Sequence, residues 1–261
     1  KWKEYYQTNQ NPIPKWMEDP RYRITKNGKW VSFTPEGERY YAEYLKSFAA
    51  NYARQIRKNQ PRALIQITWE PHYPWNFSGT AGDLVNIHRN AYQAIHAGAP
   101  NAWVIGPTAA GLDTLEWHRE LFEAGLLDYV DAISIHPYFA FPPEQNGMVE
   151  KVRALKALIR KYAGRDLDIH GNEVGFATHE LPGREKEQMY GIVRSNLILL
   201  GEGFKSNMVF YTHDYWGEPG YGYTYNLNPK REFGTDKVAP KPVAPAIGAA
   251  AYFLNGHTSA G

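Results

Sequence analysis

The chain has 261 residues, of which 43% are hydrophobic and 21% are charged, as in an ordinary globular protein. Its 29 Lys and Arg residues nearly balance its 27 Asp and Glu residues, so the net charge of +2 gives no electrostatic reason to expect nucleic acid or an anionic membrane as a partner. No apolar run is long enough to span a bilayer, and the lack of cysteine excludes disulfides, thiolate nucleophiles and cysteine-bound zinc.

Helix and strand patterns alternate along the chain. Thr34 and Pro35 begin an amphipathic run with apolar side chains three and four residues apart, and residues 80–83 have the pattern of a helix cap. We expect helices that begin near residues 34, 80, 113, 149, 189 and 242. Apolar strands are predicted between them at 63–68, 103–106, 132–135, 167–170 and 208–211.

This alternation predicts an α/β fold in which crossover helices join parallel strands. The predicted strands end near residues 70, 106, 136, 173 and 214, about one βα unit apart. A doubly wound sheet would need a glycine-rich phosphate turn after an early strand, and the sequence has none. A (β/α)8 TIM barrel fits the unit length better, with this chain carrying roughly units 4–8 plus the helix after strand 3.

We interpret residues 1–261 as a single catalytic barrel domain, because no linker, low-complexity tract or charge block divides them. The first three strands are missing from this interpretation, and a separate N-terminal segment could complete the barrel. The chain starts at Lys1 without an initiator Met or a signal peptide, so we expect it to be processed or cut. An incomplete barrel exposes strand edges, and we do not expect it to be stable alone.

Carboxylates and aromatic side chains gather where the predicted strands end. Glu70 follows Trp69 at the first strand end, Glu173 follows Asn172 at the fourth, and "SIHPYF" ends the third. In parallel α/β barrels the chemistry lies at the carboxyl ends of the strands. Two glutamates at strand ends three units apart would face each other across the mouth of the barrel.

Several motifs resemble the clan A superfamily of retaining glycoside hydrolases, most closely family 39 and its bacterial exopolysaccharide endoglycosidases. The matching pieces are "ITWEP", "AISIHPY" and "IHGNEVGF", with "NPIPKW" and "KPVAPAIGAAAYFLNG" near the ends of the chain. The resemblance covers nearly the whole chain and implies two catalytic carboxyl groups. It assigns Glu70 as the general acid/base and Glu173 as the nucleophile.

The same resemblance assigns roles to neighbouring residues. Tyr138 would orient Glu173, His136 would bond sugar hydroxyls or neighbouring catalytic groups, and Trp216 would be the platform beneath the reacting sugar. The clan usually has Asn directly before the acid/base, where it binds the sugar 2-hydroxyl, but this chain has Trp69. Asn172 or a residue of the missing part would then make that contact, or the substrate differs there.

Other aromatic residues are candidates for sugar subsites. Aromatic residues make up 15% of the chain, and many stand beside Pro, Gly, His or Asn rather than in periodic apolar segments. Trp75 and Trp16 could be subsite walls, and Tyr223 lies in a glycine-bearing loop that either packs on itself or adds subsites. Flat rings and hydroxyl donors suit a ligand with apolar faces, such as a sugar.

Rival chemistries find little support. His170, Glu173 and His179 match no helical zinc motif, so we expect no metal and no cofactor. No Gly-x-Ser-x-Gly elbow is present, Asp128 and Asp131 flank a strand start as structural residues, and His72 and His118 are expected in loops or at the surface.

The sequence therefore predicts a retaining glycoside hydrolase that cleaves a β-glycosidic bond in a polysaccharide, acting within the polymer and working outside the cytoplasm, secreted or periplasmic. Two alternatives stay open. The first is an exo-acting xylosidase or arabinofuranosidase of the same clan, and the second is a non-catalytic carbohydrate-binding barrel. In each case the partner is a polysaccharide or an oligosaccharide.

Overall fold

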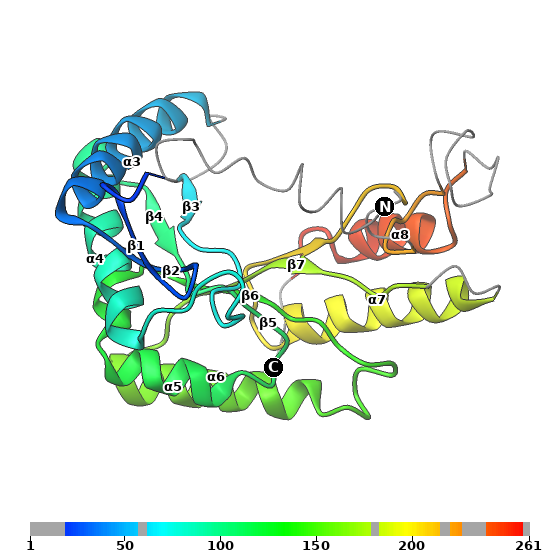
Figure 1. Ribbon diagram of the computed structural model, residues 1–261. Helices are drawn as coiled ribbons and strands as arrows, with labels where there is room; N and C mark the ends of the chain where they lie inside the picture. Colours follow the sequence, from blue (N-terminus) through cyan, green and yellow to red (C-terminus); the bar gives the residue numbers. More distant parts are fainter. Residues whose placement is uncertain (1–18, 57–61, 179–182, 215–219, 226–238, 258–261) are drawn as a thin grey trace. The chain divides into compact units, whose positions relative to one another are not determined.

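The computed structural model describes residues 19–56, 62–178, 183–214, 220–225 and 239–257 (Figure 1). Helices alternate with parallel strands, as the sequence predicts. The elements in chain order are β1 (Arg23–Lys26), β2 (Lys29–Phe33), α3 (Pro35–Gln55), β3 (Leu64–Gln66), α4 (Ala81–Gly98), β4 (Trp103–Ile105), β5 (Ala109–Ala110), α5 (Leu115–Glu123), the 3-10 helix η1 (Leu126–Tyr129), β6 (Ile133–His136), α6 (Met148–Ala163), β7 (Ile169–Val174), α7 (Arg184–Gly201), β8 (Ser206–Val209) and α8 (Val243–Leu254).

The chain divides into two compact units, and each draws on several stretches of sequence. The first takes its described residues from 1–109, 114–134 and 158–167, and the second from 110–113, 135–157 and 168–261. Glu70 belongs to the first unit, whereas His136, Tyr138 and Glu173 belong to the second. That the whole chain is one barrel domain stays a prediction.

The core of the first unit lies between α3, α4 and the parallel pair β3–β4. Strand β3 pairs with β4 in the register Leu64 to Trp103. The buried cluster beneath this pair consists of Leu45, Ala49, Ala63, Ile65, Ala91, Ala94, Ile95, Ala99, Ala102 and Val104. Small alanines on α4 allow the helix to approach the strands closely, while Leu45 fills the gap from α3.

Both helices of this core start at the residues that the sequence indicates. The Thr34 side chain accepts a hydrogen bond from Gly37 N, and Pro35 is the first helical residue of α3. At α4, Thr80 and Asp83 form a reciprocal capping box, and the helix ends at Gly98. These caps satisfy backbone donors that the first turn of each helix leaves unpaired.

An antiparallel hairpin of β1 and β2 precedes α3 and was not predicted. Its turn is Asn27-Gly28, with φ angles of 53° and 73°, the left-handed pair that a tight two-residue hairpin requires. The signal was present in the sequence, since Asn-Gly between "RITK" and "KWVSF" is a strong hairpin pattern.

The second unit contains the parallel pair β7–β8 and the helices α7 and α8. The strands of the four-stranded sheet run in the order β5-β6-β7-β8. A register shift between Gly171 and Val174 marks a bulge in β7 close to Glu173. Phe176, Ile192 and Val243 form a buried cluster, against which Phe139 and Phe141 pack.

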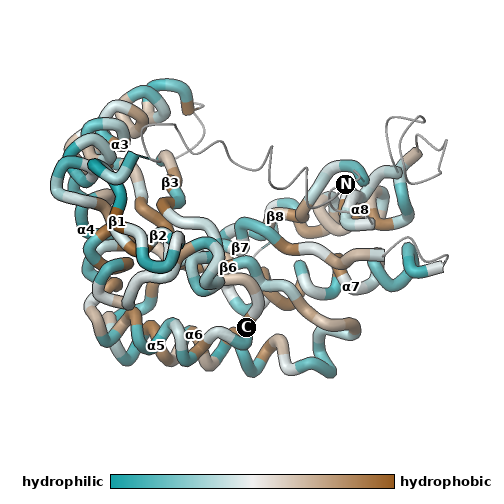
Figure 2. Tube along the Cα trace, in the orientation of Figure 1, coloured by the Kyte–Doolittle hydropathy of each residue, from teal (hydrophilic) through white to brown (hydrophobic). Residues whose placement is uncertain are grey.

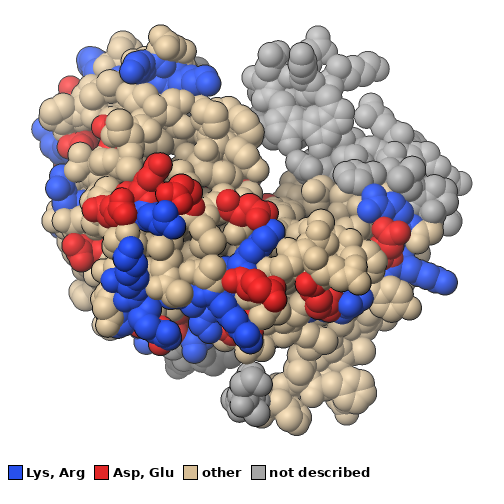
Figure 3. Space-filling view, turned by 90° about the horizontal axis from the view of Figure 1, so that it is seen from below, with Lys and Arg blue, Asp and Glu red and all other residues tan. Residues whose placement is uncertain are grey.

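The predicted helices and strands are confirmed, with strands that are shorter or shifted by a few residues. Figure 2 shows hydrophobic and hydrophilic positions alternating along helices α5 and α6, as expected of helices with one buried side. On the face shown in Figure 3, Lys and Arg side chains are mixed with Asp and Glu side chains. Among the described helices, none combines the length and the apolar character needed to cross a membrane.

Candidate active site

Glu70 follows β3 in an unusual backbone conformation. Its φ angle is +46°, in the left-handed region that residues other than Gly, Asn and Asp rarely adopt. The Glu70 carbonyl oxygen accepts hydrogen bonds from Tyr73 N at 3.1 Å and from Asn76 Nδ2 at 3.2 Å, and the residue is only 7% exposed. Such strain costs about 1–3 kcal/mol and persists at sites where the side chain must be held in one direction.

An aromatic group lies in the loop that follows Glu70. The rings of Tyr73 and Trp75 stack at 4.3 Å with an interplanar angle of 13°. The His72 ring lies against Tyr73 and also meets Trp117 edge-on at 5.8 Å. Trp69 and Trp75 are 50% and 69% exposed, so both can receive the apolar face of a ligand. Burial and the nearby Glu70 carboxylate raise the pKa of Tyr73, which keeps its hydroxyl protonated.

A buried histidine contacts the residues that lead into this loop. His88 of α4 is fully buried, and its Nε2 atom lies 3.3 Å from the Thr68 hydroxyl, two residues before Glu70. Burial lowers the pKa of His88 to about 4, so the ring stays neutral. Gly106 faces the same ring, and a Cβ there would come within 2.8 Å of His88 Cε1. The histidine therefore fills the space beneath the ends of β3 and β4.

In the second unit, Glu173 of β7 is held by two side chains from the end of β6. The Tyr138 hydroxyl donates a hydrogen bond of 2.6 Å to Glu173 Oε1. Nδ1 of the buried His136 lies 3.6 Å from the same oxygen. A short hydrogen bond to one carboxylate oxygen fixes the orientation of the side chain.

Tyr138 is itself packed in place. Its ring meets Phe210 edge-on at 6.2 Å and Tyr221 at 6.1 Å. The loop that carries Tyr221 is fixed by Gln188, whose Nε2 lies within 2.9–3.3 Å of four carbonyl oxygens, among them those of Gly220 and Tyr221. A carboxylate held by a tyrosine that is itself packed between two rings can work as a nucleophile without first being reoriented.

An ion pair anchors the same loop. Lys241 Nζ lies 2.7 Å from Asp214 Oδ2, and both side chains are largely removed from solvent. Asp214 Oδ1 also accepts a hydrogen bond from Gly222 N at 2.8 Å, which ties the pair to the loop backbone. Asp214 therefore serves the architecture of the loop.

The predicted residues can now be placed. Within the first unit, Glu70, Trp69 and Trp75 lie on one loop, and within the second, Glu173, His136 and Tyr138 are in contact. Asn172 is half-buried in β7. Tyr223 packs against the Phe176 cluster, which favours the packed-loop alternative over a subsite. Trp216, Trp16 and His179 lie outside the described residues.

Two sequence interpretations of polar residues have clear outcomes. Asp131 is structural as predicted, because its Oδ2 accepts hydrogen bonds from Val104 N at 2.7 Å and lies 3.1 Å from His96 Nε2. The placement of His118 at the surface was wrong. It is buried in α5, where Nδ1 lies 2.8 Å from Thr114 O and the ring packs beside Phe122.

Sequence reasoning missed the residues that support the two glutamates. Asn76 binds the Glu70 carbonyl within the same loop. His88 and Gln188 contact residues 20 and 32 positions away, which only the fold brings close. Asn76 in a Pro-rich loop offered a weak signal, since Asn is common in turns. His136 and Glu173 are also residue types that bind metals, and the Tyr138 hydroxyl uses one acceptor position of the Glu173 carboxylate. The expected absence of a metal stays a prediction.

No family model and no curated protein matches the sequence. Solved structures do match in fold. A family 39 glycoside hydrolase of Bacteroides cellulosilyticus WH2 has a TM-score of 0.62 at 17% identity, covering 86% of this chain and 46% of its own. A family 39 enzyme of Xanthomonas axonopodis pv. citri has a TM-score of 0.61 at 16% identity, covering 85% and 46%. A family 39 β-xylosidase of Caulobacter crescentus has a TM-score of 0.59 at 18% identity, covering 80% and 46%.

These likenesses confirm the predicted fold. The chain has an α/β architecture similar to that of these family 39 structures, so the predicted resemblance holds at the level of fold. The chain spans about half the length of the solved structures that it matches, which agrees with part of a barrel.

Proposed function

We propose that this chain carries both catalytic glutamates of a retaining glycoside hydrolase, with Glu173 as nucleophile and Glu70 as general acid/base. The observation that carries the proposal is the 2.6 Å hydrogen bond from Tyr138 to Glu173, beside the buried His136 at a strand end. Glu70 supports the proposal, because it also follows a strand, is buried and has a strained backbone conformation. The proposal requires the two carboxyl groups to converge to roughly 5–5.5 Å around a bound sugar.

The reaction then proceeds by two displacements. Ionised Glu173 attacks the anomeric carbon while protonated Glu70 gives its proton to the leaving oxygen, and the glycosidic bond breaks. The product is a glycosyl ester on Glu173. Glu70, now ionised, takes a proton from water, the water oxygen attacks the same carbon, and Glu173 leaves as a carboxylate. The Tyr138 hydroxyl holds Glu173 in line during the attack and receives it again at the end.

The substrate in this proposal is a β-linked polysaccharide, which the enzyme cleaves at bonds inside the polymer. The exposed Trp69 and the stacked Tyr73 and Trp75 support it, because they offer several ring faces beside Glu70. With a polymeric substrate of this kind, the proposal also assigns the enzyme to the outside of the cytoplasm, secreted or periplasmic. An exo-acting xylosidase or arabinofuranosidase would instead release single sugars, and product analysis separates the two.

Two variants test the roles of the glutamates. We expect Glu173→Gln to abolish turnover of every substrate, because the covalent ester cannot form. Glu70→Gln should lose hydrolysis of natural glycosides but still form the ester from aryl glycosides whose leaving group needs no proton. Rates are measured by reducing-end release, and NMR of the first product reports retention of configuration.

Because this chain covers 46% of the solved family 39 structures, activity is measured with the barrel completed by a segment that supplies the first three strands and the two helices that join them. A non-catalytic carbohydrate-binding barrel would bind oligosaccharides equally well in all variants and hydrolyse none. That result, or inversion of configuration, would contradict the proposed function.

A further inference from the structure

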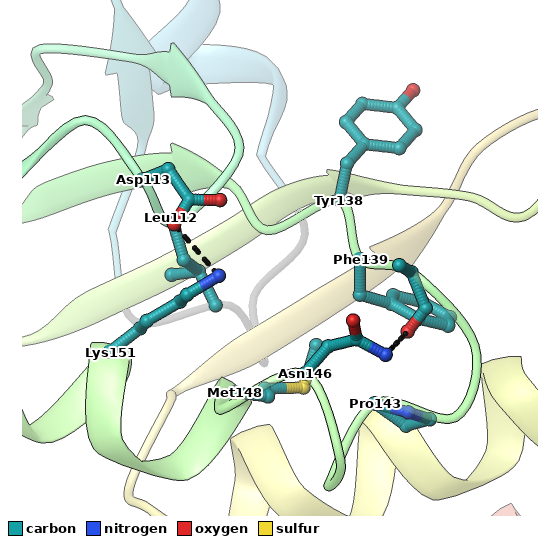
Figure 4. Close-up of a pocket in the computed structure, with 9 residues that line it drawn as sticks. Leu112, Asp113, Tyr138, Phe139, Pro143, Asn146, Met148 and Lys151 are labelled. Carbon is teal, nitrogen blue, oxygen red and sulfur yellow. Dashed lines mark hydrogen bonds and ion pairs between the residues drawn. The ribbon is translucent and has the colours of Figure 1, made fainter.

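A pocket lies in the second unit, and Glu173 is not among its lining residues. It has a volume of about 340 Å³, at the small end of the range for ligand sites. Its lining comes from the segment after β5, the β6–α6 loop and the first turn of α6 (Figure 4). The lining residues include Leu112, Asp113, Phe139, Asn146, Met148 and Lys151.

A pair of opposite charges lies in the lining of this pocket. Lys151 Nζ is 2.7 Å from Asp113 Oδ1, and the two side chains are 34% and 80% exposed. A carboxylate has about four acceptor positions and an ammonium group three donors, so the pair retains capacity for a ligand. An anionic ligand would be repelled by Asp113 and a cationic one by Lys151. Adjacent hydroxyls of a neutral sugar can donate to the carboxylate and accept from the ammonium group.

The remaining wall is apolar and held in place. Leu112 and Met148 are buried beneath this wall, and the partly exposed Phe139 is the ring that can contact the C–H face of a sugar. Asn146 Nδ2 donates to the carbonyls of Ala140 at 3.2 Å and Pro142 at 2.9 Å, which closes the loop on itself. Phe139 is also stacked on Phe176 at 5.9 Å. A pocket fixed in this way loses little freedom on binding.

Tyr138 connects this pocket to the proposed chemistry. It contributes to the lining, and its hydroxyl binds Glu173. Figure 4 shows the Tyr138 ring pointing away from Asp113 and Lys151. A sugar bound there would not be the one that reacts with Glu173.

From these observations we infer that the Asp113–Lys151 pocket is a subsite for a neutral sugar unit of the substrate, remote from the bond that is cleaved. The inference rests on the proposed function, because it places this unit on the same polysaccharide. Binding at a remote subsite accelerates reaction of long substrates only.

The kinetic test uses Asp113→Asn and Lys151→Gln, which remove one charge each. For an oligosaccharide long enough to reach the pocket, kcat/KM should fall about tenfold, whereas for a short aryl glycoside it should change less than about twofold. Arg153→Gln is the matched control, since Arg153 lies on the same helix in an ion pair with Glu202. Equal losses on both substrates, or no loss on either, would overturn the inference.

A binding test separates this inference from the proposed function. The chain has 4 methionines, so methyl labelling gives a readable spectrum in which Met148 reports on the pocket. Titration with neutral oligosaccharides should shift the Met148 methyl signal and leave that of Met208 in place, and Lys151→Gln should reduce the shift. If Met148 does not respond, the subsite is wrong even where hydrolysis is found. If Met148 responds and wild type hydrolyses no glycoside, only the proposed function fails.

Discussion

The hydrogen bond between Tyr138 and Glu173 is the single contact on which the proposed chemistry most depends. Tyr138→Phe removes the donor and keeps the ring between Phe210 and Tyr221. We expect kcat to fall roughly 100-fold, because the nucleophile loses its orienting partner, while stability changes by about 1 kcal/mol. Steady-state kinetics and urea unfolding measure the two effects separately.

The chain supplies a matched control for this substitution. Tyr162 donates an equally short hydrogen bond of 2.6 Å to Glu123, but in an exposed setting. Tyr162→Phe should therefore leave kcat within about twofold of wild type. If both tyrosine variants lose activity alike, the Tyr138 hydroxyl has no special role in the reaction.

Two buried histidines predict how stability depends on pH. Burial lowers the pKa of His88 and of His118 from 6.5 to about 4. Below pH 6.5 the unfolded chain takes up a proton at each ring, whereas the folded chain stays neutral until about pH 4. The free energy of unfolding is therefore highest above pH 6.5 with respect to these groups. It decreases as the pH falls towards 4, by roughly 3 kcal/mol for each histidine.

Urea unfolding at pH 7, 5.5 and 4.5 measures this loss. His88→Gln and His118→Phe should each flatten the dependence, and the double variant should show nearly the sum of the two effects. Unchanged slopes in both single variants would mean that other groups cause the acid sensitivity.

At the scale of elements, the buried ion pair of Lys241 and Asp214 holds the described segment 220–222, through contacts with Gly220 O and Gly222 N. Lys241→Met leaves the Asp214 carboxylate without its charge partner, and we expect a loss of about 3 kcal/mol. The double variant with Asp214→Asn should recover part of that loss, because no unpaired charge remains. The midpoints of urea unfolding measure the stability of each variant. Arg160→Gln is the control, because Arg160 and Asp166 form an exposed ion pair that contributes less than about 1 kcal/mol. Equal stability of the single and double variants would exclude a charge effect.

Local patterns predicted the elements well because their causes are local. The caps at Thr34 and Thr80 lie within four residues of the groups that they bind, and the apolar spacing of α4 follows its buried face. The conformation of Glu70 could not be predicted in this way. A residue before proline favours extended backbone, and the +46° φ angle is held by Asn76 six residues later. Tyr138 was assigned to Glu173 only through the family resemblance, since 35 residues separate them.

At the scale of the whole molecule, apolar side chains remain exposed on helices that a complete barrel would cover. On α8, Tyr252 and Phe253 are 78% and 73% exposed, and on α3, Tyr40, Tyr44 and Phe48 are exposed at a spacing of four residues. Within the described part of the chain, β3 pairs with β4 alone, and β8 ends the order of its sheet. Single exposed apolar residues are common, but several on one helix, and strand edges without a partner, are each features of interaction surfaces.

We propose that the first three strands of the barrel, with the two helices that join them, cover these surfaces. The 261-residue chain alone should then self-associate as its concentration rises, and adding the segment that carries these elements should give one species with the mass of a single complex. Size-exclusion chromatography with light scattering measures both states. The double variant Tyr252→Lys, Phe253→Lys should reduce self-association of the chain alone. It should also weaken binding of the segment, because self-association and segment binding use the same exposed residues of α8. If the chain alone stays monomeric and does not bind the segment, the exposed apolar residues of these helices are not an interaction surface.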